Sequence, residues 1–290
     1  MKKFFIIFFF IIGLSLSSNA QGSNFFEYLS ELKLPDSLYF CGERIPLEIP
    51  EVRERAEREF YLLLQQPGQV ILFLKRSGRF FPLFEKILKE KNMPDDLKYL
   101  SVAESALFMS RSVKGAVGLW QFMPATAKAY GLQVDDYVDE RCNPEKSTVA
   151  ALDYLQDGYN VHKSWLLAAA GYNMGNTNVN SAKEFQGSND YFDLFLNEET
   201  SRYILRIVII KEIMLNARNY GFRLSKDDYY KPDEVTYLEC KEGIDNLSDW
   251  AKAKGTTYKD VKLLNPWIIN RKLPSPPKGK TYMIAVPVNK

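Results

Sequence analysis

Apolar residues recur at steps of three and four through most of this chain, and this period constrains the fold more than any other feature. Val52, Ala56, Phe60 and Leu64 are one example. Such spacing places the apolar side chains on one face of an α-helix. We expect a helix beginning at 51 and further helices over 69–76, 80–91, 94–107, 124–130, 144–160, 163–172 and 198–219. The main part of the chain is therefore predicted to be α-dominated.

Other segments lack this period. Residues 21–50 and the polar stretch 173–198 are expected to be irregular, and Ser77-Gly78 is expected to break the helical region. After 224 a polar linker leads to a small unit with strands over 235–240 and 281–286. Between these strands we predict helices over 247–253 and 258–264, the first capped by Asp245 or Asn246. The order is β-α-α-β.

The first twenty residues read as a signal peptide. Lys2 and Lys3 precede an almost wholly apolar run over 4–16, and Ser18, Asn19 and Ala20 supply a small-residue cleavage site. An uncleaved anchor is the alternative, but the apolar run is shorter than the roughly 20 residues that span a bilayer. We expect export to the periplasm or cell envelope, with residues 1–20 removed.

Composition excludes several classes of function. Without Lys2 and Lys3, two of the 38 basic residues, 36 basic residues balance 36 acidic ones, so the sequence predicts no nucleic-acid binding. His162 is the one histidine, which argues against zinc chemistry, and we expect no metal and no cofactor. Cys41, Cys142 and Cys240 lie far apart, and one disulfide with any pairing stays open.

Glu104 is the residue most suited to acid catalysis. It falls near the C-terminal end of the helix expected over 94–107, among Val102, Ala103, Ala106 and Leu107. Burial among apolar groups raises the pKa of a carboxyl group, as protonation of a glycosidic oxygen near neutral pH requires. A glutamate that only forms a salt bridge at a helix end is the alternative.

Four motifs follow in order around this residue. They are Glu104-Ser105, the run from Lys114 to Ala127 with Gly118-Leu119-Trp120-Gln121, Gly171-Tyr172-Asn173-Met174-Gly175, and Glu199-Thr200-Ser201-Arg202-Tyr203. Taken together over about residues 92–215, they resemble the soluble-lytic-transglycosylase family of peptidoglycan lyases. The resemblance implies a lysozyme-like α-domain over 92–224, preceded by a helical extension over 21–91.

The resemblance also implies roles for single residues. Glu104 would protonate the glycosidic oxygen of the MurNAc-GlcNAc bond and then act as a base, leaving a 1,6-anhydro sugar and requiring peptidoglycan strands as the partner. The residues implied to bind substrate are Ser105, Ser112, Gln121, Met123, Tyr172, Asn173, Glu199 and Tyr203. Where the family often has alanine on both sides of its Tyr-Asn pair, this chain has Gly171 and Met174.

The sequence offers no second dedicated carboxylate. Asp135, Asp136, Asp139 and Glu140 are interpreted as solvated surface residues. A single acid suffices if the substrate's own N-acetyl group and 6-hydroxyl supply the remaining chemistry, as the resemblance implies.

Residues 225–290 resemble a LysM module, which implies binding of N-acetylglucosamine-containing chains, and a purely structural cap stays open. Two other functions also remain possible for the whole chain. One is a hydrolytic lysozyme- or chitinase-like enzyme, and the other is a catalytically silent peptidoglycan-binding scaffold.

Overall fold

The structure is a computed structural model that describes residues 27–288. Of these, residues 27–33 belong to one unit, in which 27–31 are helical, and residues 34–288 belong to another. The predicted signal peptide at 1–20 lies outside the described residues. None of the described helices is both long and apolar enough to cross a membrane.

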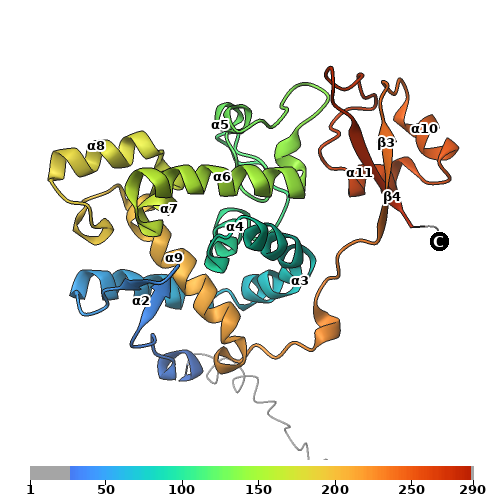
Figure 1. The fold of residues 1–290 in the computed structure, drawn as a ribbon. Coiled ribbons are helices and arrows are strands. Elements are labelled where there is room, and N and C mark those ends of the chain that lie inside the picture. The colour runs from blue at the N-terminus through green and yellow to red at the C-terminus, as the bar shows by residue number, and fades with distance from the viewer. Residues whose placement is uncertain (1–26, 289–290) are drawn as a thin grey trace, which may run out of the picture. The chain divides into compact units, whose positions relative to one another are not determined.

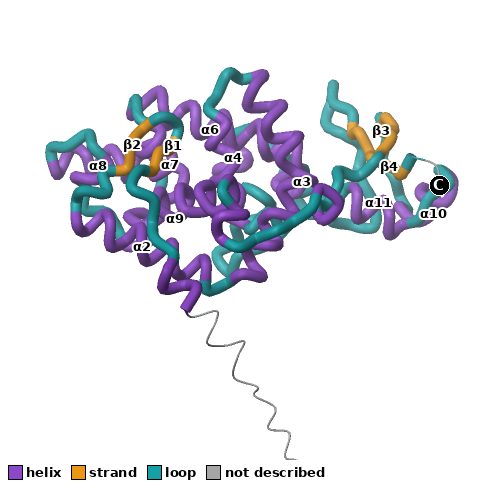
Figure 2. Tube along the Cα trace, turned by 90° about the horizontal axis from the view of Figure 1, so that it is seen from below, coloured by secondary structure: helices purple, strands orange, loops and turns teal. Residues whose placement is uncertain are grey.

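The larger unit is mainly helical, and its strands form two separate antiparallel pairs among the described residues (Figure 2). The principal elements are β1 (Leu38–Phe40), β2 (Glu43–Ile45), α2 (Pro50–Leu64), α3 (Pro67–Glu90), α4 (Lys98–Ser105), α5 (Pro124–Ala129), α6 (Pro144–His162), α7 (Trp165–Met174), α8 (Asn176–Gln186), α9 (Glu198–Leu215), β3 (Val235–Cys240), α10 (Leu247–Ala253), α11 (Tyr258–Leu264) and β4 (Tyr282–Pro287).

Helix α9 lies at the centre of the helical part, and α2, α4 and α7 all pack against it (Figure 1). Its middle is buried on every side, from Ile204 to Ile210 with the exception of Arg206. A helix that is apolar all round must be surrounded by other elements. The neighbours of α9 therefore meet around it, and the ends of α4 and α7 come together at its first turns.

Three expectations about secondary structure were wrong. Residues 38–45 form the hairpin β1-β2 instead of irregular chain, with Cys41 and Gly42 both at positive φ in its turn. Helix α3 continues through Ser77 and Gly78 without a break. Residues Asn176–Gln186 form α8, although their polar composition indicated a loop.

Gly78 has a tertiary role within α3. A Cβ built on it would lie 2.8 Å from the Cβ of Tyr229 and from the carbonyl oxygen of Tyr230. The next residues of the linker also bind α3, because the backbone N–H of Tyr230 donates to the carbonyl of Lys75 at 2.8 Å. The glycine thus permits the linker to lie directly on α3.

The small C-terminal unit has the predicted β-α-α-β order. Strands β3 and β4 pair antiparallel from Val235 with Pro287 to Cys240 with Tyr282. Asn246 caps α10 by accepting hydrogen bonds from the backbone N–H groups of Ser248 and Asp249.

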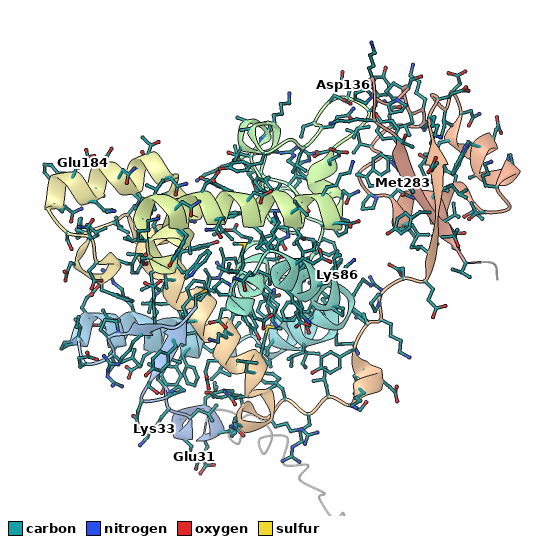
Figure 3. All side chains as sticks on the ribbon, viewed as in Figure 1. Glu31, Lys33, Lys86, Asp136, Glu184 and Met283 are labelled. Atoms are coloured by element: carbon teal, nitrogen blue, oxygen red, sulfur yellow. The ribbon has the colours of Figure 1, made fainter. Side chains whose placement is uncertain are left out.

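One residue of the helical part belongs to the core of this unit. Val138 is fully buried in a cluster with Leu247, Val261 and Ile268. The backbone next to it is also tied to the unit, since the N–H of Asp139 donates to the carbonyl of Trp267 at 2.8 Å. Figure 3 labels Asp136 in the same loop and Met283 on β4.

All three cysteines are free thiols. The disulfide that the sequence left open is therefore absent from the described residues. Burial raises the pKa of the Cys142 thiol to about 11, so the thiolate is a minor species near neutral pH.

Candidate active site

Glu104 lies on the last turn of α4, as predicted. The helix ends directly after it because Ala106 and Leu107 both adopt left-handed conformations, with φ of 56° and 55°. Left-handed backbone is unfavourable for residues other than glycine, so surrounding contacts must hold it in place. The sharp turn leaves Glu104 only partly exposed at the end of a short helix.

Two sets of contacts hold this helix end. The guanidinium of Arg76, on α3, donates to the carbonyl of Ala106 at 3.0 Å. The hydroxyls of Ser101 and Ser105 both donate to the carbonyl of Leu119, at 3.0 and 2.8 Å. Ser105 is buried, and its hydroxyl links α4 to the loop that carries the second motif.

The surroundings of Glu104 favour its protonated form. Burial raises the pKa of this carboxyl to about 7, and the nearby charge of Glu199 acts in the same direction. The hydroxyl of Tyr203 donates a hydrogen bond to Oε1 of Glu104, and this bond, with the charge of Arg206, opposes the rise in pKa. A carboxyl with a pKa near 7 exists in both forms at neutral pH, which suits proton transfer in either direction.

Helix α9 supplies one side of the site through residues spaced by three and four. Glu199, Tyr203 and Arg206 all act on Glu104, by charge or by hydrogen bond. Tyr203 is buried, whereas Glu199 and Arg206 are exposed. The i, i+4 and i, i+3 spacing places the three side chains on one face of the helix.

The last turn of α7 contributes Tyr172 and Asn173. The Tyr172 hydroxyl donates to the carbonyl of Trp120 at 2.7 Å, and its ring lies edge-on to Phe122. Asn173 donates to Oε1 of Glu199 at 3.3 Å and accepts from the hydroxyl of Thr200 at 2.7 Å. The third and fourth motifs are therefore hydrogen-bonded to each other.

Residues 110–123 form a loop, called here the glycine loop, with Gly115 and Gly118 at positive φ. Gln121 also has positive φ, and its amide donates to the carbonyl of Gly118 at 2.8 Å. Ser112 accepts from the N–H of Ala116 at 2.9 Å, and Met123 is 44% exposed. In this structure Ser112 and Gln121 thus hold the loop together, and Met123 has a free surface.

The interpretation of Asp139 and Glu140 as solvated residues was wrong, whereas Asp135 and Asp136 are exposed as predicted. Asp139 is 1% exposed and pairs with Arg141, with N–O distances of 2.8 and 2.7 Å. Arg141 also donates to the carbonyls of Gly115 and Phe122, at 2.9 and 3.0 Å. The buried ion pair therefore anchors the glycine loop at two points, Gly115 and Phe122.

Gly118 meets the same segment from the other side. A Cβ on Gly118 would lie 2.1 Å from the carbonyl oxygen of Arg141, so no other residue fits there without movement. Trp120, which the sequence left undecided between core and sugar platform, is fully buried and donates to the hydroxyl of Thr148 at 2.9 Å. Its role here is structural.

Two arginines of the site, Arg206 and Arg141, were not predicted from the sequence. Arg206 lies three residues after Tyr203 on a helix already predicted, so helical spacing from the fourth motif was a usable signal. Arg141 had none, since its partners Gly115 and Phe122 are 26 and 19 residues away.

Comparison with family models gives two matches. Residues 81–195 match the transglycosylase SLT domain, and residues 236–290 match the soluble lytic transglycosylase C-terminal LysM-like domain. The first match contains Glu104 and the motifs around Gln121 and Tyr172.

Single proteins match as well. Membrane-bound lytic murein transglycosylase D from Escherichia coli strain K12, and the same protein from Escherichia coli O6:H1 strain CFT073, are each 31% identical over 238 residues. The match covers 78% of this chain, which spans about half (50%) of those relatives. The crystal structure of the 70 kDa soluble lytic transglycosylase from Escherichia coli aligns with a TM-score of 0.40 and 21% identity, covering 52% of this chain and 26% of that one. From the two family models and the 31% identity to membrane-bound lytic murein transglycosylase D, the chain belongs to the SLT lytic transglycosylases, with an SLT domain followed by a LysM-like domain.

Proposed function

We propose that this protein cleaves the β-1,4 bond between MurNAc and GlcNAc in peptidoglycan and leaves 1,6-anhydro-MurNAc ends. The observation that carries the proposal is the environment of Glu104, a partly exposed carboxyl whose pKa is raised to about 7 and which Tyr203 orients. Such a group can donate a proton to a glycosidic oxygen and later accept one.

The reaction has two proton transfers. Glu104 first gives its proton to the glycosidic oxygen as the bond from that oxygen to C1 of the muramoyl sugar breaks. The N-acetyl group of the same sugar stabilises the positive charge left at C1. The Glu104 carboxylate then removes the proton from the 6-hydroxyl, whose oxygen bonds to C1 and closes the anhydro ring. Glu104 ends protonated, and no water is consumed.

The arrangement of the other carboxylates supports this single-acid scheme. Glu199 is exposed and accepts a hydrogen bond from Asn173. Asp139 is committed to the buried pair with Arg141. A glycosidase that uses two carboxylates needs the second one free on the opposite side of the sugar. In the proposed mechanism the substrate takes over that role.

We further propose the substrate contacts and the setting. Ser112, Gln121, Met123, Tyr172, Asn173 and Glu199 would line the sugar site. Tyr203 would hold the acid through its hydrogen bond, and Ser105 would fix the end of α4 to the glycine loop. Residues 92–224 would be the catalytic domain and 225–290 a linker and glycan-binding domain. Cleavage after residue 20 would release the enzyme into the periplasm or cell envelope.

Mass spectrometry of digested peptidoglycan tests the proposal. Purified protein should release anhydro-muropeptides, and the nearly isosteric Glu104→Gln variant should lower the rate by about a hundredfold or more, because general acid catalysis contributes on that order. Hydrated reducing ends would identify a lysozyme-like hydrolase instead. A Glu104→Gln variant as active as the parent would mean that another residue is the acid.

A further inference from the structure

Phe108 is a large apolar side chain that stays exposed in the turn directly after α4. It is 56% exposed, although most phenylalanines of this chain are buried or half-buried. A single exposed apolar residue is ordinary on a protein surface, so what matters here is where the ring lies and what holds it. It belongs to none of the motifs that the proposed reaction uses.

The turn keeps Phe108 close to the catalytic acid. The backbone N–H of Phe108 donates to the carbonyl of Ser105 at 3.0 Å, and Ser105 is next to Glu104 in the chain. This bond closes a β-turn over the left-handed residues Ala106 and Leu107, and the end Cα atoms of such a turn are less than about 7 Å apart. Phe108 is therefore close enough to contact a sugar at the bond that Glu104 protonates.

Arg76, on α3, holds the ring and the turn together. Its guanidinium carbon lies 5.1 Å from the centroid of the Phe108 ring, which is the distance of a cation–π contact. The same guanidinium donates to the carbonyl of Ala106 at 3.0 Å. Arg76 precedes residues 81–195, which match the SLT domain, so the helical extension supplies this contact.

An aromatic ring beside a glycosidic bond suits the apolar face of a sugar. A β-1,4-linked sugar ring carries C–H groups on its faces and hydroxyl groups around its edge. The face of an aromatic ring is negative and C–H hydrogens are slightly positive, so the two faces attract, and stacking removes apolar surface from water. The guanidinium leaves room for this contact, since more than half of Phe108 remains exposed beside it.

We infer that Phe108 is a further substrate-binding residue, whose ring stacks on a sugar adjoining the cleaved bond, and that Arg76 is the positioning residue that orients this ring. The inference rests on the proposed function, because it requires a glycan strand at Glu104. It makes α3 part of substrate recognition, since α3 supplies Arg76.

Substitutions that keep or remove the ring test the inference. With soluble uncrosslinked glycan strands as substrate, Phe108→Ala should lower kcat/KM by about threefold to tenfold, as expected for the loss of one stacking contact. The loss should come mainly from a higher KM, because the contact is made before and during the reaction alike. Phe108→Tyr keeps the ring and should stay near the parent value. Phe185→Ala is the matched control, at a phenylalanine of α8 that is 91% exposed.

The kinetic outcomes separate the ring from the acid. An unchanged KM in Phe108→Ala overturns the inference while cleavage by Glu104 stands. A lower kcat with unchanged KM, or a shifted alkaline limb of the pH profile, also overturns it, because the substitution would then act on Glu104 and not on sugar binding. Hydrated reducing ends from the parent would instead contradict the proposed reaction and leave the effect on KM as a measure of the ring.

Binding provides a readout that does not depend on turnover. The probe is a peptide-free tetrasaccharide of alternating GlcNAc and MurNAc, titrated by calorimetry into Glu104→Gln protein. Adding Phe108→Ala should weaken binding by about threefold or more, and adding Phe108→Tyr should not. Unchanged affinity in the Phe108→Ala protein would contradict the inference.

The role of Arg76 is tested by its dependence on the ring. Arg76→Gln should weaken binding of the same tetrasaccharide when Phe108 is present, and should add little to the loss in the Phe108→Ala protein. A residue that only stabilised the end of α4 would weaken binding equally in both proteins. Equal losses would therefore overturn the role given to Arg76.

Discussion

At the scale of single residues, the protonation of Glu104 reflects opposing effects. Burial raises the pKa of its carboxyl, whereas the hydrogen bond from Tyr203 and the charge of Arg206 lower it. With a pKa of about 7, Glu104 is present both as the carboxylic acid and as the carboxylate near neutral pH. Tyr203 therefore tunes the acid as well as orienting it.

Removing the Tyr203 hydroxyl should shift the pH dependence of the reaction. In Tyr203→Phe the hydrogen bond that stabilises the carboxylate is lost, so the pKa of Glu104 rises further. Because the donor must be protonated, kcat/KM of the parent should fall as pH rises through about 7, and the fall should move to higher pH in the variant. A pH profile of kcat/KM for both proteins measures this. An unchanged alkaline limb would assign it to another group.

The same pKa predicts a change in stability. The folded protein keeps the Glu104 proton up to about pH 7, whereas in the unfolded chain the carboxyl has its ordinary pKa of 4.5 and loses the proton there. This stabilisation is complete below the unfolded pKa and is lost as pH rises through the folded one. Relative to the parent, Glu104→Gln should therefore gain stability between pH 4.5 and 7.5, by up to about 3 kcal/mol. Urea unfolding at several pH values measures the difference, and a constant difference would argue against the raised pKa.

Gly171 departs from the alanine common in the family, and Asn176 accounts for it. A Cβ on Gly171 would lie 1.9 Å from Oδ1 of Asn176, and one on Gly158 would lie 3.1 Å from the same atom. The Asn176 side chain thus occupies the space that both glycines leave beside α6 and α7.

A double-mutant cycle tests this coupling. Gly171→Ala should destabilise the protein by about 1–3 kcal/mol, because an added methyl in a packed site forces its neighbours to move. Adding Asn176→Ala removes the clash, so the double variant should lose less than the sum of the two single losses. Thermal or urea unfolding of the four proteins gives the values. Simple additivity would show that the two residues do not compete for space.

At the scale of elements, the glycine loop is positioned from outside itself. Arg141 donates to the carbonyls of Gly115 and Phe122, and Asp139 holds Arg141 in a buried pair. The carbonyl of Leu119, in the same loop, accepts from the hydroxyl of Ser105, the residue next to Glu104. The loop and the acid are therefore connected through hydrogen bonds that secondary structure alone would not supply.

Arg141→Lys should loosen the loop. A lysine cannot reproduce the planar set of donors that reaches Asp139 and two carbonyls. We expect a loss of about 2–4 kcal/mol in stability and faster amide hydrogen exchange over residues 110–123. Arg111→Lys is the matched control, because Arg111 approaches Asp139 at 3.5 Å from an exposed position. Equal exchange in the Arg141→Lys variant and the parent would contradict this role.

Element boundaries show where sequence patterns mislead. Ser77-Gly78 indicated a break, but α3 continues through both residues. Gly78 is needed there because the linker residues Tyr229 and Tyr230 pack directly against it. The polar composition of Asn176–Gln186 indicated a loop, yet the segment forms α8 against α7. In both cases a tertiary contact outweighed the local preference.

At the scale of the whole molecule, the C-terminal unit has a core that its own sequence does not complete. Val138, from the loop between α5 and α6, is fully buried among the residues of that unit. The bridge between Val138 and Ile268 and the bond from Asp139 to Trp267 join the two backbones. The buried Asp139–Arg141 pair continues this connection to the glycine loop.

Val138→Ala should therefore weaken a unit that begins about a hundred residues later. Truncating a fully buried valine removes apolar contacts and leaves a small cavity, at a cost of about 1–3 kcal/mol. Hydrogen exchange should rise in peptides from β3 and β4. Val113→Ala, at a fully exposed valine, is the control. Unchanged protection in the C-terminal strands would show that this unit is stable without Val138.

The sequence by itself determined the features that depend on neighbouring residues. Helical period placed Glu104 at a helix end, and four local motifs were enough to find the family. The β-α-α-β order was also predicted, and Asn246, one of the two predicted caps, is the residue that caps α10. Tertiary structure alone decided that Asp139 is buried with Arg141, that Arg206 faces Glu104, and that Val138 completes another unit's core. Burial and pKa depend on groups brought together from distant parts of the chain, and no local pattern records which groups those are.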